Sequence, residues 1–160
     1  MRKTLTACLF AAVSLAGCAT SGQPFTATKY RPHGLLGGYS EKEIEPGIWR
    51  VTARSNGIAE RGFSRNMAAY RAAELLSSNG FSHVQVLDQK GEAQSIGYGG
   101  GSMSHMGETM VMTVRGANSP EQPSDCRAKD SSACMTYEAR AVMAQLAPAL
   151  YITTGAAAQQ

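Results

Sequence analysis

The stretch that decides the fold is residues 48–87, IWRVTARSNGIAERGFSRNMAAYRAAELLSSNGFSHVQVL. Residues 48–54 alternate apolar and polar side chains, which is the period of a half-buried strand. Residues 59–78 are rich in strong helix formers, with apolar side chains at three- and four-residue steps. Asn79-Gly80 then predicts the end of a helix, and residues 83–87 are typical of a second strand. We predict a strand–helix–strand crossover unit, right-handed if its two strands are parallel.

Further along the chain, the pattern predicts one more strand and one more helix. Residues 91–107 are rich in glycine, so we expect a flexible hairpin connection there. Residues 109–115 alternate again and predict a strand. After a polar loop, residues 135–146 carry an apolar stripe of helical period that Pro148 ends. The expected fold is a small two-layer α+β domain of the order β-α-β-β-α, with both helices on one face of a short sheet.

The first 17 residues have the order of a secretory signal. Two cations follow Met1, and a run of apolar or small residues then extends from Leu5 to Gly17. This run is too short for a membrane-spanning helix, which needs about 20 residues. Its end, Leu-Ala-Gly-Cys at 15–18, matches the lipobox of bacterial lipoproteins. We predict cleavage between Gly17 and Cys18; the alternative is an ordinary secretory signal cut near Ala16 or Ala19.

Cys18 is the predicted site of lipidation. Its thiol can form a stable thioether to a diacylglycerol, and cleavage frees its amine for a further acyl chain such as palmitate. Each buried methylene contributes about 0.8 kcal/mol, so two or more chains hold a protein at a membrane whereas one is marginal. We expect no other cofactor. Ala19, where retained lipoproteins have Asp, implies by resemblance to Gram-negative envelope lipoproteins an outer-membrane location facing the periplasm.

These observations divide the chain into four parts. Residues 1–17 are the expected signal peptide, and residues 18–37, broken by prolines and glycines, the lipidated N-terminus and a flexible tether. Residues 38–153 form the single α+β domain that a chain of 160 residues predicts. Residues 154–160 are small or polar and expected to be a frayed tail.

Two cysteines remain in the mature domain. Cys126 and Cys134 flank a polar, loop-like segment, and in an oxidising compartment such a pair is expected to form a disulfide. The alternative is a metal or redox site. Zinc usually needs four ligands in paired short spacings, and a redox pair is usually spaced C-x-x-C. The C-x7-C spacing therefore favours the structural disulfide.

Charge argues against a nucleic-acid partner. The formal net charge is +3, but Arg2 and Lys3 lie in the predicted signal peptide. Without them 13 basic residues face 12 acidic ones, so the mature chain is close to neutral. No run of more than two cations occurs anywhere in the sequence. A broad basic footprint for nucleic acid is therefore not expected.

Beyond these patterns, the chain resembles a group of small uncharacterised bacterial lipoproteins. The resemblance is carried by the Gly-Tyr-Ser block at 38–40, the helix tetrad Arg-Ala-Ala-Glu at 71–74 and Gly-Phe at 80–81. A late helix ahead of Leu-x-Pro, here at 146–148, is also similar. The resemblance covers mainly residues 38–90. It implies the topology and the lipid anchor, and no activity or catalytic residues come with it.

Two groups of residues could carry a function. Met103, His105 and Met106 offer soft donors that suit Cu(I), although neighbouring methionines on a strand are equally typical of core packing. Tyr39, Arg71 and Glu74 could line a patch for a partner protein or an envelope polymer; the alternative for Arg71 and Glu74 is a local ion pair.

From these residues we predict a lipid-anchored, non-enzymatic interaction or structural module of the cell envelope. Periplasmic copper binding is the alternative. An enzyme whose site is assembled from distant residues is the third hypothesis, because no hydrolase motif is present.

Overall fold

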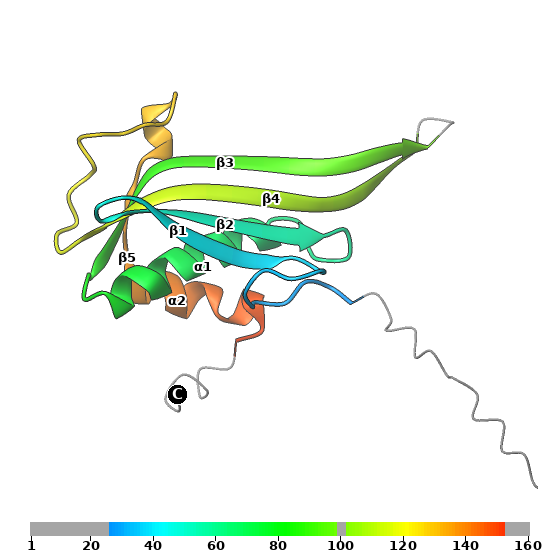
Figure 1. The fold of residues 1–160 in the computed structure, drawn as a ribbon, viewed down its shortest axis with the longest axis horizontal. Helices are drawn as coiled ribbons and strands as arrows, with labels where there is room; N and C mark the ends of the chain where they lie inside the picture. Colours follow the sequence, from blue (N-terminus) through cyan, green and yellow to red (C-terminus); the bar gives the residue numbers. More distant parts are fainter. Residues whose placement is uncertain (1–25, 99–101, 153–160) are drawn as a thin grey trace, which may run out of the picture.

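The computed structural model describes residues 26–98 and 102–152. Its core is a five-stranded antiparallel sheet of order β1-β2-β4-β3-β5, with helices on one face (Figure 1). The strands are β1 (Gly38–Glu45), β2 (Ile48–Asn56), β3 (His83–Tyr98), β4 (Ser102–Ala117) and β5 (Thr136–Glu138). The helices are α1 (Phe63–Ser78) and α2 (Ala139–Leu146), with short 3-10 helices η1 (Ser131–Ala133) and η2 (Pro148–Leu150).

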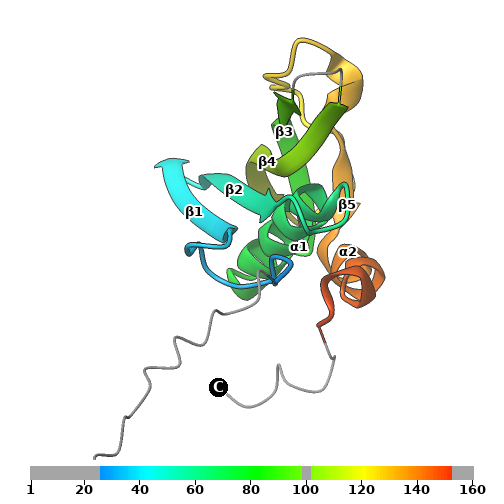
Figure 2. The ribbon, with the colours of Figure 1, turned by 90° about the vertical axis from the view of Figure 1, so that its right-hand side faces the viewer.

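The predicted α+β class and the position of the helices are confirmed. Figure 2 shows α1 and α2 side by side on the same side of the sheet. Strands β2 and β3 both pair antiparallel with β4, which lies between them, so β2 and β3 are parallel to each other. The expected crossover through α1 is therefore present, with β4 inserted between its two strands. None of the helices in the described part of the chain is long and apolar enough to cross a membrane.

Helix α1 packs its apolar side on β2 and β4. Met67 and Leu76 of the helix are fully buried with Val51 and Val114 of the sheet. The helix begins at Phe63, four residues later than predicted, because the Asn56 side chain accepts hydrogen bonds from Ile58 and Ala59 and forms a turn there. Gly62 then takes a left-handed conformation with a φ of 83°.

Hydrogen bonds cap both ends of α1. The Glu108 carboxylate of β4 accepts hydrogen bonds from the Gly62 backbone N–H (2.8 Å) and the Ser64 hydroxyl (3.2 Å). A carboxylate at this position also complements the positive end of the helix dipole. At the other end the Phe81 backbone N–H donates to the Leu76 carbonyl (3.0 Å), with Gly80 left-handed, as the sequence predicts.

The expectation of a flexible connection over residues 91–107 is wrong. Residues 91–98 continue β3, and residues 102–107 belong to β4, so the two strands form a hairpin much longer than predicted. Glycine lowers strand propensity but does not forbid pairing when a partner strand runs alongside. Gly91 shows why glycine is accepted here, because an added Cβ would lie 3.2 Å from the Met110 Cε.

Two boundaries also differ from the prediction. Strand β1 was not expected, since most of its side chains are polar, as an edge strand tolerates. The predicted helix over 135–146 begins only at Ala139, because residues 136–138 pair with β3 as strand β5.

The expected tether is ordered where it is described. Thr28 is buried, and its hydroxyl donates to the Leu36 carbonyl (2.6 Å) and accepts from the Asn56 backbone N–H (2.8 Å). Tyr30 packs against the core. The folded domain therefore includes residues 26–37, and the flexible part of the prediction is wrong for them. The expected frayed tail at 154–160 lies outside the described residues.

Candidate functional site

The predicted signal peptide and lipidation site lie outside the described residues, so cleavage between Gly17 and Cys18 stays a prediction. The predicted disulfide between Cys126 and Cys134 is confirmed. It closes the loop that leads into η1 and β5, and this loop is hydrogen-bonded to β3 through the Arg127 backbone N–H and the Leu87 carbonyl (2.8 Å).

Ion pairs attach the same loop to the sheet. Arg127 forms a bidentate pair with Glu45 of β1 (2.6 and 2.8 Å), and its hydrogen bonds hold the pKa of the Glu45 carboxyl below its usual range. Arg115 of β4 pairs with Asp125 (2.8 and 2.9 Å). Burial opposes ionisation of Asp125, but the Arg115 hydrogen bonds outweigh it and lower the pKa of this carboxyl. Such exposed pairs contribute little individually, and together they orient the loop over the end of the sheet.

Next to this loop, the structure contains a pocket of about 530 Å³ between α1, α2 and the sheet. Sequence reasoning missed it because residues from six elements and loops form it. Most of its surface is apolar and comes from Ala69 and Ala72 of α1, Val84 and Val86 of β3, Met112 of β4, Val142 and Leu146 of α2, and Met135 and Tyr137 before and within β5. The polar residues that line it are Arg65, Asn66, Gln89, Ser132 and Gln145.

The structure brings together Tyr39, Arg71 and Glu74, which the sequence placed in a possible partner patch. The Arg71 guanidinium donates to Glu74 (2.5 Å) and to Glu41 (2.7 Å), and its Cζ lies 4.7 Å above the centre of the Tyr39 ring. Tyr30 completes the group: its hydroxyl donates to Glu74, and its ring lies 4.8 Å from that of Tyr39. We call these five residues the tyrosine–arginine cluster.

The electrostatics of this cluster follow from its partial burial. Burial and the hydrogen bond to Glu74 raise the pKa of Tyr30 above its ordinary value. Burial likewise raises the pKa of Tyr39, which Arg71 partly offsets. Burial alone would lower the pKa of Arg71, but the hydrogen bonds to Glu41 and Glu74 outweigh it and raise this pKa. Arg71 is therefore a permanent cation that donates hydrogen bonds to two carboxylates of the domain. Because Glu41 lies on β1, this side chain connects α1 to β1.

Tyr30 and Glu41 of this cluster were missed by sequence reasoning. Tyr30 is an aromatic residue in a segment that was expected to be a polar tether, and this was the available signal. Their contacts with Arg71 and Glu74 join positions 30 to 44 residues apart. Local periodicity carries no information on such pairs.

The suggested metal ligands are only partly brought together. Met103 and His105 lie on one face of β4 and line a depression of about 370 Å³ with Glu108 and Arg61. Met106 does not line this depression; it is the unpaired residue where the register of β4 with β3 shifts between His105 and Gly107. The Nε2 atom of His105 is buried and has no hydrogen-bond partner among the described residues.

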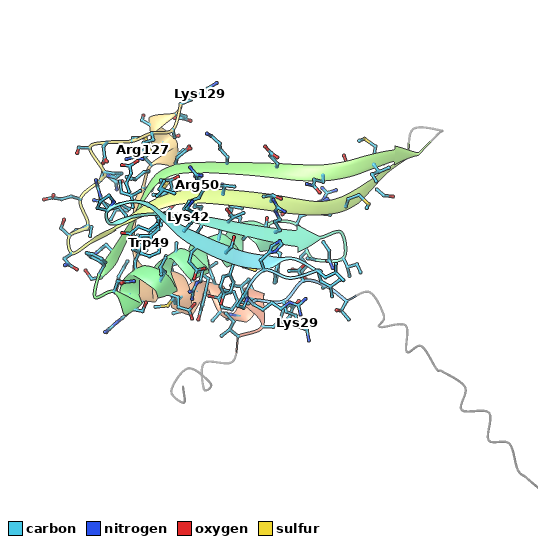
Figure 3. The ribbon with its side chains drawn as sticks, viewed as in Figure 1. Lys29, Lys42, Trp49, Arg50, Arg127 and Lys129 are labelled. Carbon is cyan, nitrogen blue, oxygen red and sulfur yellow. A yellow bond between two sulfur atoms is a disulfide. The ribbon has the colours of Figure 1, made fainter. Side chains whose placement is uncertain are left out.

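The face of the sheet away from the helices is polar and carries several cations (Figure 3). Lys42 of β1 and Arg50 of β2 are direct cross-strand neighbours, and both are exposed. Like charges in this arrangement are mildly destabilising. Arg127 lies nearby in Figure 3 and is paired with Glu45, so the cations do not form a continuous unpaired patch.

By its fold and sites, this protein is a small α+β domain with a split β-α-β topology. It has an apolar pocket beside a disulfide-closed loop. Comparison with protein families, with curated proteins and with solved structures finds no match for this chain. The resemblance to small bacterial lipoproteins therefore stays a prediction from its motifs.

Proposed function

We propose that this chain is a lipid-anchored lipoprotein of the bacterial cell envelope, and that its domain is a non-enzymatic interaction module. The observation that carries the proposal is the outer part of the β3–β4 hairpin, residues 94–98 and 102–106, which we call the arm. Figure 1 shows the arm extending well beyond the other strands. Apolar side chains stand exposed along it, namely Ile96 (47% exposed), Met103 (69%) and Met106 (46%).

The arm has the properties of a docking element. In the part of the chain that the structure describes, β5 pairs with the outer edge of β3 only as far as Gln85, and β2 pairs with β4 only from Gly107 onward. Beyond these points β3 and β4 pair only with each other. The backbone of a two-stranded ribbon with both edges open can accept a further strand, and alternate side chains then provide specificity. Exposed apolar residues on such an element commonly mark an interaction site.

The first described residues lie beside the point where the arm begins. The Thr26 carbonyl accepts a hydrogen bond from the Asn56 side chain (2.7 Å), and Asn56 is the residue of β2 that pairs with Gly107. An extended chain spans at most roughly 3.6 Å per residue, so eight residues from Cys18 reach no more than about 29 Å. Lipidation at Cys18 would thus keep the arm close to the membrane surface, where an envelope partner can meet it.

Intact mass of the protein purified from membranes tests the anchor. We expect a species that begins at Cys18, carries added acyl mass and lacks 2 Da for the disulfide, whereas a Cys18→Ser variant lacks the acyl mass. An uncleaved chain, or an unacylated chain cut elsewhere, would contradict the anchor.

Site-specific photocrosslinking in cells tests the arm. A photoreactive amino acid in place of Ile96 or Met103 is expected to give a discrete protein adduct, while one in place of exposed Arg140 on α2 gives none. The Cys18→Ser variant should weaken the adduct, because the arm leaves the membrane surface. Adducts of equal yield from Arg140, or lipid adducts alone from the arm, would contradict the proposed role.

Soft-metal binding is the second candidate, and the buried, unpartnered Nε2 of His105 beside Met103 favours it. A Cu(I) titration of the purified protein should then give one equivalent of binding that His105→Ala and Met103→Leu weaken. Met106→Leu is the matched control, since Met106 lies outside the depression. Substoichiometric or absent binding would reject copper.

A further inference from the structure

The pocket between α1 and α2 has a structural cause. Ala69 and Ala72 lie one turn apart on α1 and line the pocket, and so does Ala133 of η1 at the disulfide-closed loop. Side chains that end at Cβ leave room where the two helices and the loop meet. The resulting volume of about 530 Å³ falls in the range of small-molecule sites, roughly 300 to 1,000 Å³.

The interior of this pocket suits an apolar group. Val84, Val86 and Met112 from the sheet and Val142 and Leu146 from α2 line it. The first three of these are buried within the protein core. An alkyl chain that enters here meets hydrocarbon on several sides and brings no polar atom that would need a partner. An unbranched chain can also bend to follow a gap between two helices.

The margin of the pocket suits an acid. Among the residues that line the pocket, Arg65 carries the only acidic or basic side chain. Arg65 is exposed, and it takes part in no ion pair among the described residues. A guanidinium binds a carboxylate through two parallel hydrogen bonds. The amide groups of Asn66 and Gln89 also line the pocket, and that of Gln89 donates to the Ala133 carbonyl (3.4 Å).

We propose that this pocket binds a fatty acid, with its alkyl chain against Val86, Met112 and Leu146 and its carboxylate at Arg65. Met135 and Tyr137 border the pocket and are two of the large apolar side chains that the domain exposes, at 40% and 39%. Covering them would be part of the gain on binding. The site is separate from the arm, so the two roles can succeed or fail independently.

The test uses the full protein purified from membranes, reconstituted in lipid nanodiscs and titrated with a photoactivatable diazirine derivative of palmitic acid. After illumination, labelled peptides are mapped by mass spectrometry, which separates pocket labelling from probe dissolved in lipid. We expect saturable labelling of α1 and α2 that excess palmitic acid removes. Arg65→Gln should weaken it about three- to tenfold for the acid and leave labelling by the methyl ester of the probe unchanged. Arg140→Gln, on α2 outside the pocket, is the matched control.

Filling the pocket supplies the second criterion. Ala69→Leu should abolish labelling, whereas Ala69→Ser, which keeps the size of the side chain, should preserve it. If Ala69→Leu fails to fold, Val142→Phe fills the same space from α2. Labelling that does not saturate, that spreads over the surface, or that survives both filling substitutions would overturn the proposal. Saturable pocket labelling that is equal for acid and ester, and indifferent to Arg65→Gln, would overturn the assignment of a carboxylate ligand.

Discussion

The β3–β4 hairpin passes through two very different environments along its length. Near its open end, β4 lies between β2 and β3 and packs on α1, and Met112 and Val114 are almost completely buried. In the arm the same two strands pair only with each other, and residues 94–97, 103, 104 and 106 are exposed. We call the packed part, residues 83–91 and 108–117, the base.

This difference means that one part of the hairpin stabilises the fold and the other is exposed for binding. Local stability follows the number of buried apolar groups and of backbone hydrogen bonds shielded from water. The base has both, with a helix on one face and a disulfide-closed loop attached at its end. A two-stranded ribbon without a third strand or a helix is marginally stable in water. The base therefore holds the fold, and the arm presents backbone edges and apolar side chains at little cost to folding.

The largest expected contrast is between equivalent truncations in the two regions. Leu76→Ala removes a fully buried side chain from α1 beneath the base and should lower the free energy of unfolding by about 2–5 kcal/mol. Ile96→Ala in the arm should change it by less than about 0.5 kcal/mol. Urea denaturation followed by circular dichroism measures both. A cost for Ile96→Ala close to that for Leu76→Ala would mean that the arm belongs to the cooperative core.

The disulfide should be the next largest contribution to the base. The bond closes a loop with a sequence separation of 8, and in the chain-entropy model so short a loop contributes about 2–3 kcal/mol. Replacing Cys126 and Cys134 together by Ser should lower the unfolding free energy by that amount, with a further cost because Cys134 is buried. Denaturation with and without reductant is the measurement, and insensitivity of the wild type to reduction would refute a structural role.

The sequence predicted the base and the elements that pack beside it, β2 and α1, better than the arm because these parts have regular local patterns. Alternation over residues 48–54 and 109–115 and helical period over 59–78 each reflect one buried face, and all three elements are present. The arm has no buried face, so no alternation marks it, and its glycines are typical of a loop. Strand β1 was missed for the same reason, since an edge strand with one polar face and Glu41 on the other shows little contrast.

The candidate sites were predictable only in part. The disulfide and the group of Tyr39, Arg71 and Glu74 were named from sequence, and the structure brings the members of each together. The partners Tyr30 and Glu41 and the whole pocket between the helices were not. Their geometry depends on how α1, α2 and the disulfide-closed loop pack, which no local pattern encodes.

The junction of base and arm offers a matched pair of glycines. Gly107 has a φ of 139°, and an added Cβ would lie 2.1 Å from the Ser55 carbonyl oxygen. Gly107→Ala should therefore strain the backbone and lower the unfolding free energy by about 1–3 kcal/mol. Nothing lies within 4 Å of a Cβ at Gly97 in the arm, so Gly97→Ala should be close to neutral. Thermal denaturation of both variants checks this, and equal melting temperatures would show that the junction tolerates a shift.

The smallest effect concerns pH and involves tyrosines that pack around α1 and β1, away from the arm. Burial raises the pKa of Tyr30, Tyr39 and Tyr70 in the folded state, whereas unfolded tyrosines ionise near pH 10. Above that pH the unfolded chain loses protons that the folded domain keeps. The stability that these tyrosines contribute is thus fully present below about pH 10 and is lost as the pH rises further, by at most about 1.4 kcal/mol per pH unit for each tyrosine.

Tyr30→Phe removes one of these groups and should flatten the alkaline decline, at the cost of about 1 kcal/mol at neutral pH for the lost hydrogen bond to Glu74. Tyr151→Phe, at an exposed position (75%), is the control. Urea denaturation between pH 8 and 11 gives the slopes, and hydrogen exchange of the arm should be the same in both variants. If Tyr30→Phe leaves the dependence of the unfolding free energy on alkaline pH unchanged, the raised pKa of Tyr30 is contradicted. Altered hydrogen exchange in the arm would show that the arm is coupled to the region around Tyr30.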